Sequence, residues 1–132
     1  MDKRIELPGI PDSIAQVEQF IEELRVECGF REDVCGNVII AVTEAVNNSI
    51  YHGSKCNPDK KFSLRVFRIA PYKISISVED DGPGFNPDIL PDPTSPELID
   101  KPGGRGVFLM RNLADQVLFE EEGRRVILFF NI

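Results

Sequence analysis

Residues 81–104 are rich in proline and glycine, and this stretch constrains the fold more than any other part of the sequence. Proline fixes φ and lacks an N–H donor, and glycine loses more conformational entropy on ordering than other residues. The segment therefore cannot form regular structure for long, and the core must come from the residues on either side of it. A loop of this length in a compact domain usually has a function. Since 132 residues is a usual size for one domain, we expect a single domain over 1–132.

The spacing of apolar residues predicts the regular elements on both sides of this loop. Glycines at Gly29 and Gly53 end the two long helical patterns, and Glu122–Gly123 forms a hairpin turn. The predicted elements are a strand at 3–8, helices at 11–28 and 32–51, strands at 61–69 and 73–80, a helix at 106–114, and strands at 116–121 and 125–132. Their order predicts an α+β fold, a two-layer sandwich with helices covering one face of a mostly antiparallel sheet.

Composition excludes several classes of function. A net charge of −7 and a pI near 4.7 disfavour direct binding to nucleic acid. The chain has no apolar run of about 18 residues, so we expect no membrane span, and its start lacks the apolar core of a signal peptide. The odd number of cysteines, without a Cys-x-x-Cys pair, argues against a disulfide framework or a zinc site. We therefore expect a cytoplasmic protein.

The helix predicted at 32–51 carries polar residues on a side of their own. On a helical wheel Asn37, Glu44, Asn48 and His52 gather together. The core face of this helix holds Val38, Val42, Ala45, Val46, Ser49 and Ile50. Glu44 and Asn48 lie one turn apart, so a carboxylate able to deprotonate an attacking group stands beside a carboxamide oxygen suited to Mg²⁺. Taken alone, the pair is more often the solvated face of an amphipathic helix.

Asp80 stands in the inward phase of the strand predicted at 73–80. Ile74, Ile76 and Val78 alternate toward one face, and Asp80 continues that phase. A carboxylate aimed at the interior needs a partner, and the amino group of adenine is a suitable donor. Gly82 and Gly84 follow at once and would let the backbone approach a flat ligand closely.

Two other interpretations of this segment stay open. The commoner one is a strand that ends in an Asp-Gly turn. A calcium loop built from Asp80, Asp81, Asn86 and Asp88 is also conceivable, although its spacing does not fit the EF-hand pattern.

Glycines open the helix predicted at 106–114. Gly103, Gly104 and Gly106 surround Arg105, and the N–H groups at such a helix start favour phosphate, to which Arg105 could add a charged contact. The pattern matches neither the Walker motif nor the dinucleotide-binding motif. Considered alone, it is more often a flexible loop that leads into a helix.

Together the three motifs resemble those of the GHKL, or Bergerat-fold, ATPases. EAVNNSIYHG (44–53) is similar to the N box, EDDGPGF (79–85) to the first glycine box, and GGRGVFLMRNLAD (103–115) to the second. The Glu-Ala-Val, His-Gly and Asp-Gln-Val runs are typical of the serine kinases that act as anti-sigma factors. The resemblance covers essentially the whole chain and implies an α/β sandwich with a mixed sheet.

The resemblance also implies roles for individual residues. Glu44 corresponds to the catalytic base, Asn48 to the Mg²⁺ ligand and Asp80 to the aspartate that binds adenine. Gly82 and Gly84 would lie beside the base. Gly104, Arg105 and Gly106 would lie near the phosphates, under a lid at 86–102.

The implied activity is ATP- and Mg²⁺-dependent phosphorylation of a serine on an anti-sigma-factor antagonist of the STAS type. The resemblance leaves open whether a sigma factor also binds, and it implies a homodimer. One departure concerns the terminal hairpin, where family members often carry Gly-Thr and the threonine supports the adenine aspartate. Here Arg124 follows Gly123, so this support is missing or comes from elsewhere.

Three other functions fit the sequence less well. A module that sequesters a regulator without phosphorylating it would not need Glu44. The catalytic domain of a sensor histidine kinase would need a phospho-acceptor histidine outside the N box, but the one histidine, His52, lies within it. A chaperone-like or topoisomerase-like ATPase would need additional transducer domains.

Overall fold

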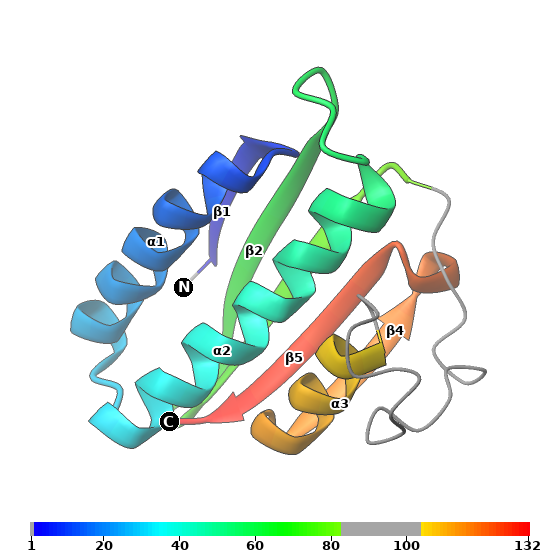
Figure 1. The fold of residues 1–132 in the computed structure, drawn as a ribbon. Coiled ribbons are helices and arrows are strands. Elements are labelled where there is room, and N and C mark those ends of the chain that lie inside the picture. Colours follow the sequence, from blue (N-terminus) through cyan, green and yellow to red (C-terminus); the bar gives the residue numbers. More distant parts are fainter. Residues whose placement is uncertain (1, 83–103) are drawn as a thin grey trace.

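The computed structural model describes residues 2–82 and 104–132, and Figure 1 shows their arrangement. The regular elements are β1 (Asp2–Pro8), α1 (Ile14–Cys28), α2 (Glu32–Asn48), β2 (Lys61–Ala70), β3 (Lys73–Asp80), α3 (Gly104–Leu113), β4 (Gln116–Glu120) and β5 (Arg125–Asn131). Short 3₁₀ turns precede α1 and join β4 to β5, and a π turn, Ser49–Gly53, extends α2. Every predicted helix and strand is confirmed, with boundaries that differ by a few residues.

The strands form one five-stranded sheet in the order β1-β2-β3-β5-β4. All four neighbouring pairs among the described residues are antiparallel, which confirms the mostly antiparallel sheet. The parallel pair that a mixed sheet requires is not found in this part of the chain. The terminal hairpin folds back so that β5, rather than β4, pairs with β3, and β4 becomes the edge strand.

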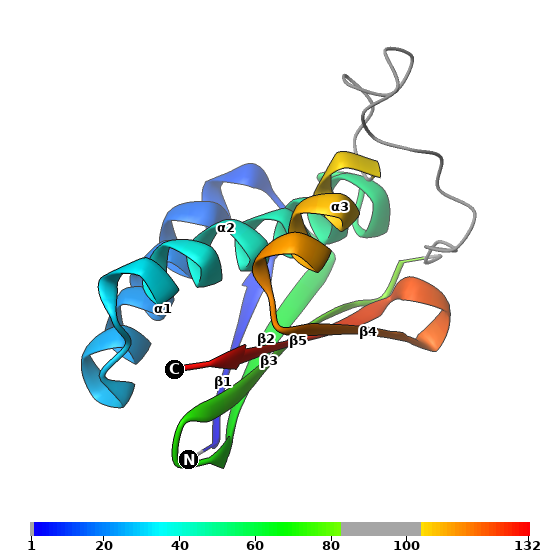
Figure 2. The ribbon, with the colours of Figure 1, turned by 90° about the horizontal axis from the view of Figure 1, so that it is seen from below.

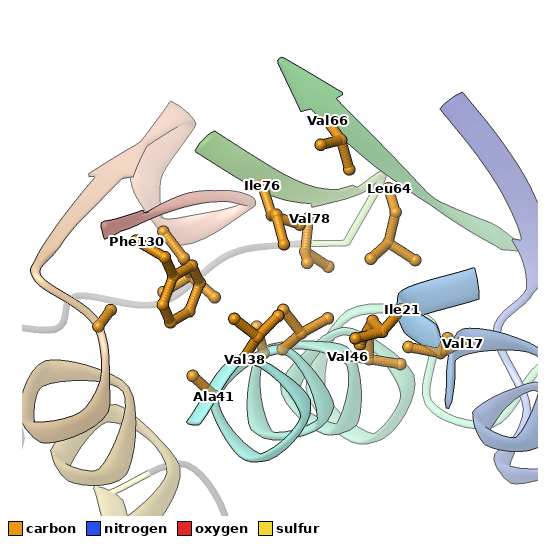
Figure 3. Close-up of a cluster of buried hydrophobic side chains, with 14 of the residues drawn as sticks. Val17, Ile21, Val38, Ala41, Val46, Leu64, Val66, Ile76, Val78 and Phe130 are labelled. Carbon is orange, nitrogen blue, oxygen red and sulfur yellow. The ribbon is translucent and has the colours of Figure 1, made fainter. Parts of the chain in front are cut away.

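The helices form a second layer over one face of the sheet, as Figure 2 shows from below. Side chains from both layers interdigitate between them, including Ile21 of α1, Val38 of α2 and Phe130 of β5 (Figure 3). No described helix covers the other face. That face carries ion pairs such as Arg125 to Glu79, with 3.1 Å between Nε and Oε2, which suit contact with water.

Local chemistry explains where the helices begin and end. Gly29 ends α1 in the left-handed conformation at φ 71°, and its N–H donates to the Arg25 carbonyl. Glu32 and Asp33 lie in the first turn of α2, where acidic side chains complement the helix dipole. No helix among the described residues is long and apolar enough to cross a membrane.

The π turn at the end of α2 positions the functional segment. The N–H of Ser54 donates to the Ser49 carbonyl at 2.8 Å, five residues back, so the last turn is wider than an α turn. The Ser54 hydroxyl lies 2.7 Å from the carbonyl oxygen of Gly9 and 3.0 Å from that of Ile50, and it can donate its one hydrogen to either. These bonds tie the turn to the chain that leaves β1.

Candidate functional site

A pocket opens between the two layers, where the carboxyl end of α2 faces the ends of the central strands. Its lining comes from α2 and the π turn, from β3, from α3 and from the terminal hairpin. The lining residues are Ala45, Asn48, Ser49, His52, Gly53, Val78, Asp80, Met110, Phe119, Gly123, Arg124 and Val126. Apolar side chains therefore line much of the pocket, with a few polar groups that could orient a ligand.

Glu44 and Asn48 lie against the start of α3. A Cβ at Gly106 would stand 3.1 Å from Oε2 of Glu44 and 3.4 Å from Nδ2 of Asn48. Glu44 and Asn48 therefore lie close to Gly106 at the start of α3, and a side chain larger than that of glycine would crowd them. Two of the three predicted motifs are thus brought together by the packing of α3 on α2 (Figure 1).

Asp80 lies at the end of β3 and is half-buried, as its inward phase predicted. The N–H of Gly82 donates to Oδ1 of Asp80 at 2.7 Å. Burial raises the pKa of Asp80 above its ordinary value, while the hydrogen-bonded Gly82 N–H and the Ser49 hydroxyl act in the opposite direction. A donor from a ligand would further stabilise the ionised carboxylate.

Two glycines bring the N box and the first glycine box into direct contact. Gly53 lies against the carboxylate of Asp80, and Gly82 lies against the backbone of Gly53. A Cβ at either position would come closer to these atoms than real Cβ atoms do. The first and second motifs of the predicted site therefore share one wall of the pocket.

The residues present fit a magnesium ion that arrives with phosphates. Nδ2 of Asn48 is buried and has no hydrogen-bond partner within the described part of the chain. A half-turn of the amide would present its oxygen at the same place, beside Glu44, which is the oxygen chemistry that Mg²⁺ prefers. No group of three or more His, Cys, Asp or Glu side chains in residues 2–82 and 104–132 could hold a metal by itself. Mg²⁺ bound chiefly through phosphates and water needs no such group.

The structure describes some of the remaining predicted site residues and not others. Gly104 and Arg105 lie in the first turn of α3. Gly84, the lid at 86–102 and the calcium ligands Asn86 and Asp88 lie outside the described residues. The roles assigned to these residues stay predictions.

Several residues that line the pocket are not predicted from the sequence, although the sequence position of one of them, Ser49, indicates a role. Ser49 lies on the predicted core face of its helix, where a hydroxyl needs a partner, and it lines the pocket together with Asp80. The sequence predicts Gly53 only as the end of a helix, but it also forms the surface against which the Asp80 carboxylate lies. Met110 and Phe119 look like ordinary core residues in the sequence, and only the packing of α3 and β4 brings them to the pocket.

Comparisons with known proteins agree with this geometry. The model of one family, the histidine kinase-like ATPase domain, matches residues 7–130. The serine-protein kinase RsbW of Listeria innocua is 26% identical over 131 residues, which cover 94% of this chain and 83% of the relative. RsbW of Staphylococcus aureus is 28% identical over 124 residues, covering 89% of this chain and 78% of the relative.

A solved structure supports the fold. The RsbU and RsbW domains of Rv1364c from Mycobacterium tuberculosis match with a TM-score of 0.66 at 13% identity over 99% of this chain. The chain spans only 32% of that longer protein chain. The resemblance inferred from the three motifs is confirmed: this chain belongs to the family of histidine kinase-like ATPase domains.

Proposed function

We propose that this protein is an ATP-dependent serine-protein kinase whose substrate is another protein. The observation that carries the proposal is the contact of Glu44 and Asn48 with Gly106 at the start of α3. It places a carboxylate beside N–H groups that favour phosphate, which is the arrangement a phosphoryl transfer needs. Family membership and the names of the RsbW relatives support the same activity.

Each wall of the pocket would bind one part of ATP. Asp80 would accept a hydrogen bond from the adenine amino group, with Gly82 and Gly84 beside the base. Val78 and Met110 would contact its faces. The N–H groups of Gly104, Arg105 and Gly106 would receive the phosphates, and the amide oxygen of Asn48 would hold Mg²⁺. Bound Mg²⁺ would neutralise charge on the phosphates.

Glu44 would act as the general base. Its carboxylate would take the proton of a serine hydroxyl as the serine oxygen forms a bond to the γ-phosphorus. The bond from that phosphorus to the bridging oxygen of the β-phosphate would break, and ADP would leave. The residues mainly position the reactants and stabilise charge, as in other phosphoryl transfers.

The surface near Glu44 suits a protein substrate. Ile40 lies one turn before Glu44 on α2, and Phe108 lies on α3 just after Gly106. Their relative exposures are 45% and 43%, so each of these two helices presents a large apolar side chain that a partner could contact. We infer a partner that docks here and presents a serine, namely an anti-sigma-factor antagonist of the STAS type. We further infer a cytoplasmic homodimer that could also bind a sigma factor.

Phosphate transfer provides the test. The purified protein is incubated with labelled ATP, Mg²⁺ and candidate antagonist domains from the same genome, and phosphoserine is located by mass spectrometry. We expect transfer to one serine of a cognate domain and little ATP turnover without it. Glu44→Gln should keep ATP binding but slow transfer by roughly 10²–10⁴-fold.

Two outcomes would contradict the proposal. If ATP is hydrolysed equally fast with and without every antagonist, and no phosphoserine forms, a regulatory ATPase is the better description. If ATP binds but neither transfer nor turnover occurs, the protein is a sequestering module. A Glu44→Gln variant that transfers phosphate at the normal rate would exclude Glu44 as the base.

A further inference from the structure

A second concave surface lies between α1 and α2, which are side by side in the helix layer (Figure 1). Its lining residues are Glu22, Arg25, Glu32, Cys35, Gly36 and Ile39, and we call it the α1–α2 groove. It lies near the short connection that joins the end of α1 to the start of α2. Both of its walls are helices, a geometry into which a third helix can pack.

The floor of the groove is apolar and is open at Gly36. Cys35 is buried, and Ile39 is partly buried against the core. Glycine is unfavourable inside a helix, and a Cβ built on Gly36 would meet nothing within 4 Å. The fold does not need a glycine at this position. Its small size leaves a space that an apolar side chain of a partner can fill, as a knob fills a hole between packed helices.

The rim of the groove carries exposed carboxylates. On α1, Nε of Arg25 donates to Oε1 of Glu22 at 2.8 Å, so the basic residue of this wall is already paired. On α2, Glu32 is exposed and belongs to no ion pair within residues 2–82 and 104–132. A cation that approaches Glu32 therefore displaces no existing partner.

The acidic charge of the described residues is concentrated on these two helices. Together α1 and α2 contain seven acidic residues and one basic residue. The five strands contain five acidic and seven basic residues. The potential around the groove therefore attracts a basic partner. A second copy of this chain, with a net charge of −7, is a poor occupant.

The groove is separate from the pocket of the proposed nucleotide site. Gly36 precedes Asn48 by twelve residues on α2, which is about 18 Å along the helix axis. Glu44 lies close to Gly106 of α3, whereas the groove lies on the side of α2 that faces α1. A ligand in the groove therefore need not touch the residues assigned to phosphoryl transfer.

We propose that the α1–α2 groove binds a basic amphipathic helix of a partner protein. An apolar side chain of that helix would fill the space above Gly36, and lysine or arginine residues beside it would meet Glu32 and Glu22. The interaction goes beyond the proposed kinase activity and does not depend on it. It gives the protein a partner surface apart from the one through which a serine would reach Glu44.

NMR titration of the full chain with two synthetic peptides tests the proposal. The probe is a peptide of about 18 residues, five helical turns, with leucine on one side and lysine on the other. The control peptide has the same composition in an order that mixes the two residues around the helix. We expect the probe to shift the amide signals of Gly36 and Ile39 and to bind roughly tenfold more tightly than the control peptide. Its affinity should fall as salt is added, because the charges of the rim are exposed.

Gly36→Leu fills the groove without threatening the fold. Leucine is a better helix former than glycine, and its Cβ has room, so the variant should be at least as stable as the parent. The probe should bind this variant roughly tenfold more weakly, the effect of losing one buried apolar contact. ATP affinity should stay unchanged.

A pair of charge variants tests the rim. Glu32→Gln should weaken binding of the probe roughly threefold, as loss of one exposed ion pair does. Glu6→Gln removes the same charge from β1 and is the matched control. It should have little effect on binding of the probe.

Three outcomes would overturn the proposal. Equal binding of the two peptides, or normal binding to Gly36→Leu, would show that the groove does not receive the helix. Equal losses in Glu32→Gln and Glu6→Gln would show attraction to the overall acidic charge and not to the rim. If Gly36→Leu changes the sedimentation of the protein alone, the occupant is a second copy of this chain. Phosphate transfer is measured separately, so these failures would leave the proposed function standing.

Discussion

At the scale of single residues, the site places a carboxylate where burial disfavours its charge. Asp80 is half-buried, and burial raises its pKa, against the opposing effects of the Gly82 N–H and the Ser49 hydroxyl. The same burial would strengthen a hydrogen bond from a ligand, because fewer water molecules compete for the carboxylate. The protein is therefore less stable than it would be with an uncharged residue at this position. The charge, however, favours recognition of a hydrogen-bond donor on a ligand.

Asp80→Asn should reveal this conflict in the pH dependence of stability. The parent's Asp80 pKa is raised on folding, so the parent loses stability as pH rises from the unfolded pKa through the folded one. The variant has no ionisable group at this position, so its free energy of unfolding should rise relative to that of the parent over this pH range. Urea unfolding at several pH values measures the effect. ATP binding should weaken by about 1–3 kcal/mol. Parallel stability curves for the two proteins would contradict the role of burial.

Gly106→Ala tests the junction of α2 and α3. The new Cβ would lie 3.1 Å from Oε2 of Glu44, a contact that the flexible carboxylate can relieve by moving. We expect the variant to fold normally, to bind ATP within a few-fold of the parent, and to transfer phosphate roughly 10–100-fold more slowly, because a displaced base loses alignment. Single-turnover kinetics separate the transfer rate from binding. An unchanged transfer rate would show that Glu44 need not lie where it does.

At the scale of elements, two glycines in neighbouring helices have opposite roles. Gly29 ends α1 at φ 71°, where a Cβ is strained whatever space surrounds it. Gly36 lies within α2, and a Cβ built on it meets nothing within 4 Å. The first glycine is required by the turn, whereas the second adds conformational freedom to the unfolded chain.

Alanine at each position should therefore shift stability in opposite directions. Gly29→Ala should lower the free energy of unfolding by about 1 kcal/mol, and Gly36→Ala should raise it by about 0.5–1 kcal/mol. Urea unfolding with an unchanged m-value is the measurement, and each variant serves as the control for the other. A stabilising Gly29→Ala would mean that α1 can end without a left-handed residue.

At the scale of the whole molecule, the layered fold leaves one helix surface open beside the site. α1 and α3 pack on the two sides of α2, so the outer side of α2 stays exposed together with part of α3 (Figure 2). Ile40 and Phe108 are exposed apolar residues on these two helices. A docking partner would therefore meet both helices and reach Glu44 from outside.

Phe108→Ala should weaken the protein substrate and not ATP. We expect its KM for the antagonist to rise roughly tenfold, as truncation of an aromatic interface residue often does, while ATP affinity and thermal stability stay unchanged. Val26→Ala is the matched control, because Val26 is 74% exposed but lies near the far end of α1. Equal effects of the two variants would show that docking does not involve α3.

The helices and strands could be read from local patterns because their signals are local. Alternating residues such as Ile74, Ile76 and Val78 predict a strand that is buried on one face, and Gly29 predicts a helix end. The strand order could not be read in this way. Which strand of the terminal hairpin pairs with β3 depends on contacts between distant residues, and both strands alternate in the same manner.

The sequence by itself determined the elements of this protein, the layered α+β class and the three motifs that bring Glu44, Asn48, Asp80 and Gly106 into one hypothesis. These features follow from spacing within single segments. Only the tertiary structure decided that β5 lies beside β3, that Gly53 supports Asp80, and that the Ser49 hydroxyl lines one pocket with Asp80. The physical reason is the same in each case. A hydroxyl or a glycine shows its role only through the neighbour it touches, and packing selects that neighbour from a distant part of the chain.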